Sequence, residues 1–216
     1  AYGSDDIAVR ALQRGAVSYV RKRELAVTLT ETVRTVLALL PTTDSDPTLQ
    51  SSQALAIVEW ELGNDLAEIP RVVGQIESRL MRSSAYDLSW RIQMSVVLQE
   101  ALFNAILHGN LELSSSLKEA DPDAFDALAR ERQETPPYRD RRARVTVMET
   151  DEELTCVVSD EGPGFDLSLV PDPTDPTNLE RTTGRGLFLI RTFMTTVHHS
   201  DGGRTIAMVK RRSSEE

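Results

Sequence analysis

The most informative string of the sequence is EALFNAILHGN, from Glu100 to Asn110. It closes a helix predicted over residues 87–108, in which Glu100, Asn104 and His108 recur every four residues. On an α-helix this spacing keeps side chains on one face, with a drift of about 40° per step. Three apolar residues occupy the opposite face and can pack against a core: Val97, Ala101 and Ile106. A carboxylate, a carboxamide and an imidazole on one face indicate a polar site, and a solvated helix face is the alternative interpretation.

A second motif, DEGPGF, covers residues 160–165 and directly follows a strand predicted at 154–159. An aspartate at a strand end can point into a cleft, and Gly162 and Gly164 let the backbone approach a planar ligand closely. The alternative is a simple turn that closes the strand.

A third motif, GRGL, covers residues 184–187 and opens a predicted helix. Free backbone amides and the positive end of the helix dipole form a ready anion site there. The alternative is a loop-to-helix junction without a ligand. The glycine spacing is that of neither a dinucleotide-binding turn nor a P-loop.

Taken together and in this order, the three motifs resemble the N, G1 and G2 boxes of the GHKL ATPases. The resemblance runs over about residues 55–211 and is greatest to the anti-sigma-factor serine kinases. It implies a Bergerat ATP-binding fold, which is an α/β (α+β) two-layer sandwich. Its sheet would be mixed but mostly antiparallel, with helices on one face. It also implies ATP and Mg²⁺ as cofactors, an anti-anti-sigma (STAS) protein as the substrate of a serine/threonine kinase, and a sigma factor as a second partner.

The resemblance also implies a role for each matching residue. Glu100 would be the general base for an attacking hydroxyl, and the Asn104 carboxamide oxygen would bind Mg²⁺. Asp160 would accept a hydrogen bond from the adenine amino group. The other positions implied to bind or support ATP are His108, Asn110, Gly162, Gly164, Gly184, Gly186 and Thr205.

An arginine just before the second glycine box contacts the γ-phosphate in those kinases. The string LERTTGRGL has one extra residue at this point. Arg181 and Arg185 therefore remain alternative candidates.

The rest of the domain shows strand and helix patterns on both sides of these motifs. Strands are predicted at 55–62, 144–149, 154–159 and 205–210, and helices at 65–82, 122–133 and 186–196. The segment 111–141 is a longer insertion than the compact kinases have. We interpret it as a partner surface, and a solvated excursion is the alternative. Four basic residues close to its end are interpreted as a solvated patch: Arg139, Arg141, Arg142 and Arg144.

Residues 1–40 resemble the C-terminal part of a response-regulator receiver domain, on the strings AYGS and SYVRKRE. Lys22 falls on the position of the lysine that contacts the phosphoryl group in that family, and an unrelated βα fragment is the alternative. The phosphoacceptor aspartate would lie upstream, so we expect a truncated receiver–kinase protein. The expected organisation continues with a linker at 41–53, the ATPase domain at 54–211 and a tail at 212–216.

Composition narrows the class of protein. The net charge of −10 and the pI near 4.9 argue against bulk nucleic-acid binding, which needs a basic surface. No run approaches the roughly 20 apolar residues of a spanning helix, so no membrane partner is expected. A single cysteine fits the reducing bacterial cytoplasm. Because GHKL kinases often dimerise, the resemblance also implies a homodimer.

Two other functions fit the same motifs. One is an ATP-binding partner-switch module without phosphotransfer, which the presence of Glu100 disfavours. The other is the catalytic domain of a two-component kinase. The sequence has three histidines: His108, His198 and His199. None of them lies on a helix before the ATPase part, which disfavours a two-component kinase.

Overall fold

The computed structural model describes residues 56–80, 86–165 and 185–212, together with the isolated residues Ala11, Leu29 and Val33. Apart from those three residues, the predicted receiver-like fragment and linker lie outside the described residues. Arg181 and Gly184 also lie outside them.

A five-stranded sheet forms one layer of the domain, in the order β1-β2-β3-β5-β4. All of its neighbouring pairs are antiparallel, whereas the sequence analysis expected some parallel pairing. The strands are β1 (Ala56–Leu62), β2 (Ala143–Glu149), β3 (Glu153–Ser159), β4 (Thr196–Ser200) and β5 (Thr205–Arg211). Alternating burial along β2, β3 and β5 shows that one face packs on a core and the other does not.

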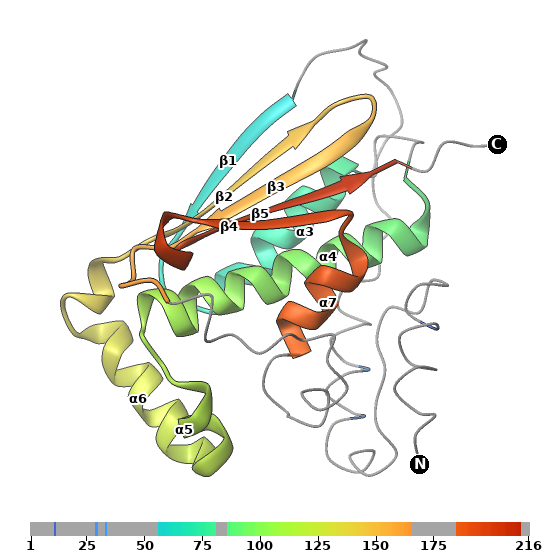
Figure 1. The fold of residues 1–216 in the computed structure, drawn as a ribbon. Coiled ribbons are helices and arrows are strands. Elements are labelled where there is room, and N and C mark those ends of the chain that lie inside the picture. Colours follow the sequence, from blue (N-terminus) through green and yellow to red (C-terminus); the bar gives the residue numbers. More distant parts are fainter. Residues whose placement is uncertain are drawn as a thin grey trace.

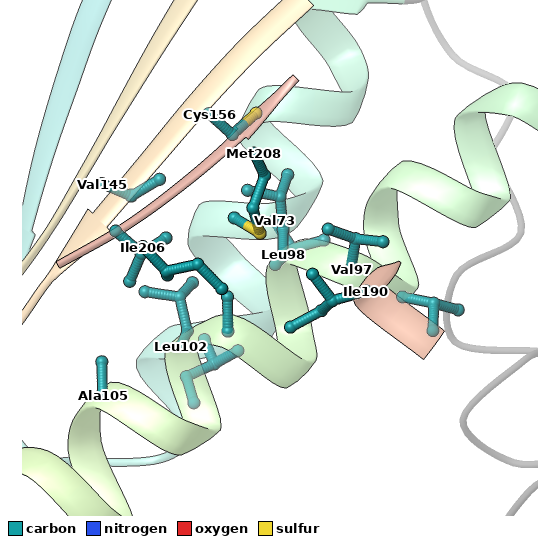
Figure 2. Close-up of a cluster of buried hydrophobic side chains, with 14 of the residues drawn as sticks. Val73, Val97, Leu98, Leu102, Ala105, Val145, Cys156, Ile190, Ile206 and Met208 are labelled. Atoms are coloured by element: carbon teal, nitrogen blue, oxygen red, sulfur yellow. The ribbon is translucent and has the colours of Figure 1, made fainter. Parts of the chain in front are cut away.

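Three helices cover the packed face of the sheet: α3 (Glu68–Leu80), α4 (Leu88–Phe103) and α7 (Arg185–Phe193) (Figure 1). In the core, Val97 and Leu98 of α4 and Ile190 of α7 lie against Cys156 and Met208 of the sheet (Figure 2). Fully burying an aliphatic side chain stabilises the fold by about 1.5–3 kcal/mol. This core therefore holds α4 firmly on the sheet, and the two-layer sandwich is confirmed.

The helix that carries the first motif changes its winding part-way along. Asp87 caps α4 by accepting a hydrogen bond from the Trp90 backbone N–H at 2.6 Å. From Asn104 to Asn110 the chain continues as a π-helix, η2. The prediction of one α-helix over 87–108 is therefore wrong for its last turns. A π-helix inside a helical run is a local change of winding that is common at functional sites, and periodicity along the sequence does not reveal it.

The insertion forms a helical hairpin that projects from the domain beside the end of η2 (Figure 1). It contains α5 (Ser115–Ala120), α6 (Pro122–Glu134) and the short 3₁₀ helix η3 (Tyr138–Asp140). The predicted helix at 122–133 corresponds to α6, and Asp121 caps it by accepting from the Ala124 N–H at 3.0 Å. The sequence analysis missed α5 because one and a half helical turns are too short for a periodic signal.

The end of the domain differs from the prediction in one element. The predicted helix at 186–196 ends at Phe193, and Thr196 begins the unpredicted edge strand β4. A short 3₁₀ turn, η5 (Asp201–Gly203), joins β4 to β5, with φ of 62° at Gly202 and 90° at Gly203. Only glycine adopts such values without strain, so the Asp-Gly-Gly string was the available hairpin signal. Within the described residues, no helix has the length and apolar character needed to cross a membrane.

Candidate functional site

The end of the first motif and the start of the second are in direct contact. A Cβ atom added to Gly109 would lie 2.3 Å from the Asp160 Cγ, and one added to Gly162 would lie 2.2 Å from the Gly109 carbonyl oxygen. The Asp160 Oδ1 accepts a hydrogen bond from the Gly162 N–H at 2.8 Å. No side chain fits at either glycine, because each approach is closer than a real Cβ contact permits. The two glycines thus allow the N-box helix (α4 and η2) to pack against the Asp160 carboxylate at the end of β3.

Asp160 is held in an environment that is unusual for a carboxylate. Burial raises the pKa of Asp160 to about 6, although the Gly162 N–H and the positive charges of Arg204 and Arg141 act in the opposite direction. A partly desolvated carboxylate at a strand end is a strong acceptor for a donor of matching shape, such as an exocyclic amino group.

The rest of the second motif packs on the turn between β4 and β5. Gly164 has a φ of 78°, and a Cβ there would lie 2.2 Å from the Gly202 carbonyl oxygen. The Phe165 N–H donates to that same oxygen at 2.9 Å. Thr205 begins β5 and pairs with Ser159, so its backbone is at the same end of the sheet as Asp160. Its neighbour Ile206 is buried in the core, so strand alternation places the Thr205 side chain on the face without helices.

The first motif also meets the third. Glu100 and Asn104 are both half-buried, and they lie on successive turns of α4 and η2. A Cβ added to Gly186 would lie 2.5 Å from the Glu100 Oε2, so the first turn of α7 rests against this carboxylate. Arg185 is the first residue of α7. The helix therefore presents its N-terminus beside a carboxylate, and a helix N-terminus favours phosphate groups.

His108 and Asn110 support the surrounding backbone. The exposed His108 ring contacts the Leu113 carbonyl oxygen through Nδ1 at 2.6 Å. Asn110 is completely buried, and its Nδ2 donates to the Asn64 Oδ1 at 2.9 Å. Its Oδ1 accepts from the Glu161 N–H at 2.9 Å. Asn110 thereby joins the end of the N-box helix to the loop that carries Asp160 and Gly162.

All of these contacts lie within one known domain type, because the family model for the histidine kinase-like ATPase domain matches residues 62–210. The chain belongs to this family. No curated protein matches it. The family is of the GHKL type, and its domain implies ATP binding, as the three motifs led us to expect.

The described part of this ATPase domain fits ATP and one hard metal ion. The Gly109–Gly162 contact and the Asp160 acceptor suit an adenine ring, and the α7 N-terminus suits phosphates. No group of three or more His, Cys, Asp or Glu side chains among the described residues is arranged to hold a metal. Mg²⁺ commonly takes only one or two protein oxygens, with phosphates and water completing its shell. Asn104 fits that requirement.

Sequence reasoning missed three residues of the ATPase site. Gly109 was part of the quoted motif and directly follows the helix predicted over 87–108, a position that indicates only the end of a helix. Asn64 and Asp65 stand at the start of the helix predicted over 65–82, where such residues are typical helix caps. Asp65 does accept from the Ala67 N–H at 2.9 Å, but Asn64 is buried against Asn110.

Arg141 is the third of these residues, and it was assigned to a solvated patch. Its side chain is only 19% exposed and donates to the Asn110 carbonyl oxygen at 2.7 Å. The solvated-patch interpretation is therefore wrong for Arg141, although Arg139 is 53% exposed as expected. Nothing in the one-letter sequence separates the two arginines, because their difference lies in which of them faces the end of η2.

Proposed function

We propose that this ATPase domain is a Mg-ATP-dependent protein serine/threonine kinase of the anti-sigma-factor type, and that it phosphorylates an anti-anti-sigma (STAS) partner. The observation that carries the proposal is the position of Glu100, whose carboxylate lies against the first turn of α7 and one turn before Asn104. A pure nucleotide-binding module needs an anion site but no carboxylate base next to it. A kinase needs both.

Each residue would have one task in the transfer. Asp160 would select adenine through its amino group, and the N-terminus of α7 would hold the phosphates. Bound Mg²⁺, held by the Asn104 Oδ1, would neutralise negative charge on the phosphates. Glu100 would take the proton from the hydroxyl of the substrate serine. That oxygen forms a bond to the γ-phosphorus, the bond to the β–γ bridging oxygen breaks, and its electron pair leaves with ADP.

The direct test is transfer of label from γ-labelled ATP to a STAS-domain protein, with the phosphoamino acid identified by its acid stability. Glu100→Gln removes the base but keeps the shape, so we expect transfer to fall by about 10²–10⁴-fold. We expect ATP affinity to change little, because the base acts on the acceptor hydroxyl. Glu131→Gln removes an exposed carboxylate on α6 and is the matched control.

The other functions give different results in the same assay. Nucleotide binding without transfer to any STAS protein would favour the partner-switch module. Acid-labile label would favour a two-component kinase domain. Unchanged transfer by Glu100→Gln would contradict the assignment of the base even if the kinase activity itself is present.

A further inference from the structure

The insertion supplies a side chain to the end of the N-box helix. The Arg132 Nη1 on α6 donates to the Leu111 carbonyl oxygen at 2.6 Å and to the Glu112 carbonyl oxygen at 2.9 Å. The chain turns sharply here, since Glu112 has a φ of 51°, which a residue other than glycine rarely adopts. The last carbonyl groups of a helix have no partner within the helix. Arg132 satisfies two carbonyl groups at such an end.

A second arginine from the insertion binds the same end. The Arg141 Nη1 donates to the Asn110 carbonyl oxygen at 2.7 Å and lies 2.8 Å from the Glu112 Oε1. The Tyr138 ring lies beside both guanidinium groups, at 4.7 Å from the Arg132 Cζ and 5.1 Å from the Arg141 Cζ. Three consecutive carbonyl groups, from residues 110 to 112, are thus bound by two cations that pack on one aromatic ring.

The residues that directly follow the insertion also fix the loop of the second motif. The Glu161 carboxylate accepts from the Arg142 N–H at 3.1 Å and pairs with the Arg144 Nη2 at 3.3 Å. The Glu161 N–H donates to Asn110, as described above. Asn64 completes the connection, because its Nδ2 donates to the Tyr138 carbonyl oxygen at 2.7 Å. The insertion, the end of η2 and the loop of Asp160 therefore form one hydrogen-bonded unit.

We propose that Arg132 and Arg141 are positioning residues for nucleotide binding, so that the insertion sets the geometry of the adenine end of the site. This inference rests on the proposed binding of ATP at Asp160. Without the two guanidinium groups, three carbonyl groups at the end of η2 lose their partners and the turn loosens. Gly109 is one residue before this turn and contacts Asp160 and Gly162. A shift there changes the position of the carboxylate that accepts the adenine amino group.

Arg141 also acts on Asp160 through its charge. The charged groups that face Asp160 are Arg204 and Arg141, which lower its pKa, and Asp201, which raises it. The Gly162 N–H bond lowers that pKa as well. Removing the Arg141 charge would therefore raise the pKa of Asp160. A purely structural role for Arg141 would not move the pH at which ATP affinity is half lost.

The experiment measures ATP binding by calorimetry on the full chain between pH 5 and 8. We expect Arg132→Gln and Arg141→Gln each to weaken ATP binding by about tenfold, because buried carbonyl groups lose their donors. The matched controls are Arg130→Gln on the exposed side of α6 and Arg139→Gln in η3, and both are expected to bind ATP within about twofold of wild type. Arg141→Gln should also move the pH midpoint upward, and Arg141→Lys should restore it.

The outcomes separate this inference from the proposed function. Wild-type protein that binds no ATP would overturn both. Wild-type protein that binds ATP, with arginine variants that bind equally well, would overturn only the positioning role. If the arginine variants do not fold, Tyr138→Leu replaces them, because it removes the ring and keeps both charges. We then expect a loss of about threefold in ATP affinity, and unchanged affinity would count against the proposal.

Discussion

The two ends of the site are built in different ways. At the end that we propose binds adenine, backbone contacts backbone or the Asp160 carboxylate, and the glycines at 109, 162 and 164 leave no room for a Cβ atom. At the end that we propose binds the phosphates, Glu100 and Asn104 are half-buried side chains on a helix face, and Gly186 is the one glycine of the described residues that closely approaches them. The first end therefore depends on close backbone packing, and the second end depends on the functional groups of its side chains. We expect substitutions at the first end to abolish ATP binding and substitutions at the second end to slow phosphotransfer.

The sharpest test of this difference is Gly162→Ala. Its Cβ would lie 2.2 Å from the Gly109 carbonyl oxygen, and neither backbone segment can move without disturbing Asp160. We expect no measurable ATP binding by calorimetry. Gly74→Ala is the control, because nothing lies within 4 Å of its Cβ on α3, and it should stabilise the protein by about 0.5–1 kcal/mol. ATP binding by Gly162→Ala at wild-type strength would show that the adenine end is not rigid.

Asp160→Asn should separate stability from function at the adenine end. Losing the charged acceptor is expected to weaken ATP binding by about 10–100-fold, measured by calorimetry. Burial raises the pKa of Asp160 from its ordinary value of 3.8 to about 6, so the folded protein binds this proton more tightly than the unfolded chain. The contribution of Asp160 to the free energy of unfolding therefore declines as the pH rises from about 4 to about 6. We expect Asp160→Asn to raise the melting temperature at pH 7, and a lower one would contradict this account.

At the phosphate end, Gly186→Ala should impair transfer more than folding. The added Cβ would lie 2.5 Å from the Glu100 Oε2, which is the far end of a flexible side chain and can move aside. We expect about tenfold slower phosphotransfer with a nearly unchanged melting temperature. The double variant with Glu100→Ala removes the contact, so any loss of stability should disappear. Complete loss of ATP binding by Gly186→Ala, as expected for Gly162→Ala, would remove the distinction between the two ends.

The smallest effect is expected far from both ends, at Lys210. This buried residue donates to the Gln93 Oε1 and lies 5.5 Å from the Trp90 ring centroid. Burial lowers the pKa of Lys210 from 10.5 to about 8, so the unfolded chain binds more protons than the folded protein between these values. Stability should therefore rise with pH from about 8 to about 10.5. Lys210→Met should abolish that rise in thermal denaturation and leave ATP affinity unchanged.

Much of this protein can be predicted from its sequence by itself. The alternation of β2 and β3, the acidic turn between them and the apolar face of α4 are local patterns, and each predicted its element. The three motifs predicted the ATPase family because their residue types and order are specific even without coordinates. Local periodicity reports which face of an element is buried, and that information is enough for the fold class.

Several features of the site arise from tertiary packing and leave no local pattern in the sequence. The π-helical end of the N-box helix is held by residues distant in sequence, since the Asn110 side chain donates to Asn64 and accepts from the Glu161 N–H. The different surroundings of Arg139 and Arg141, two residues apart, follow from where the insertion meets Asn110. The close approach of Gly109 to Asp160 joins residues 51 positions apart. Spacing along a chain does not encode such distances, because they arise only when the helix, the sheet and the insertion pack together.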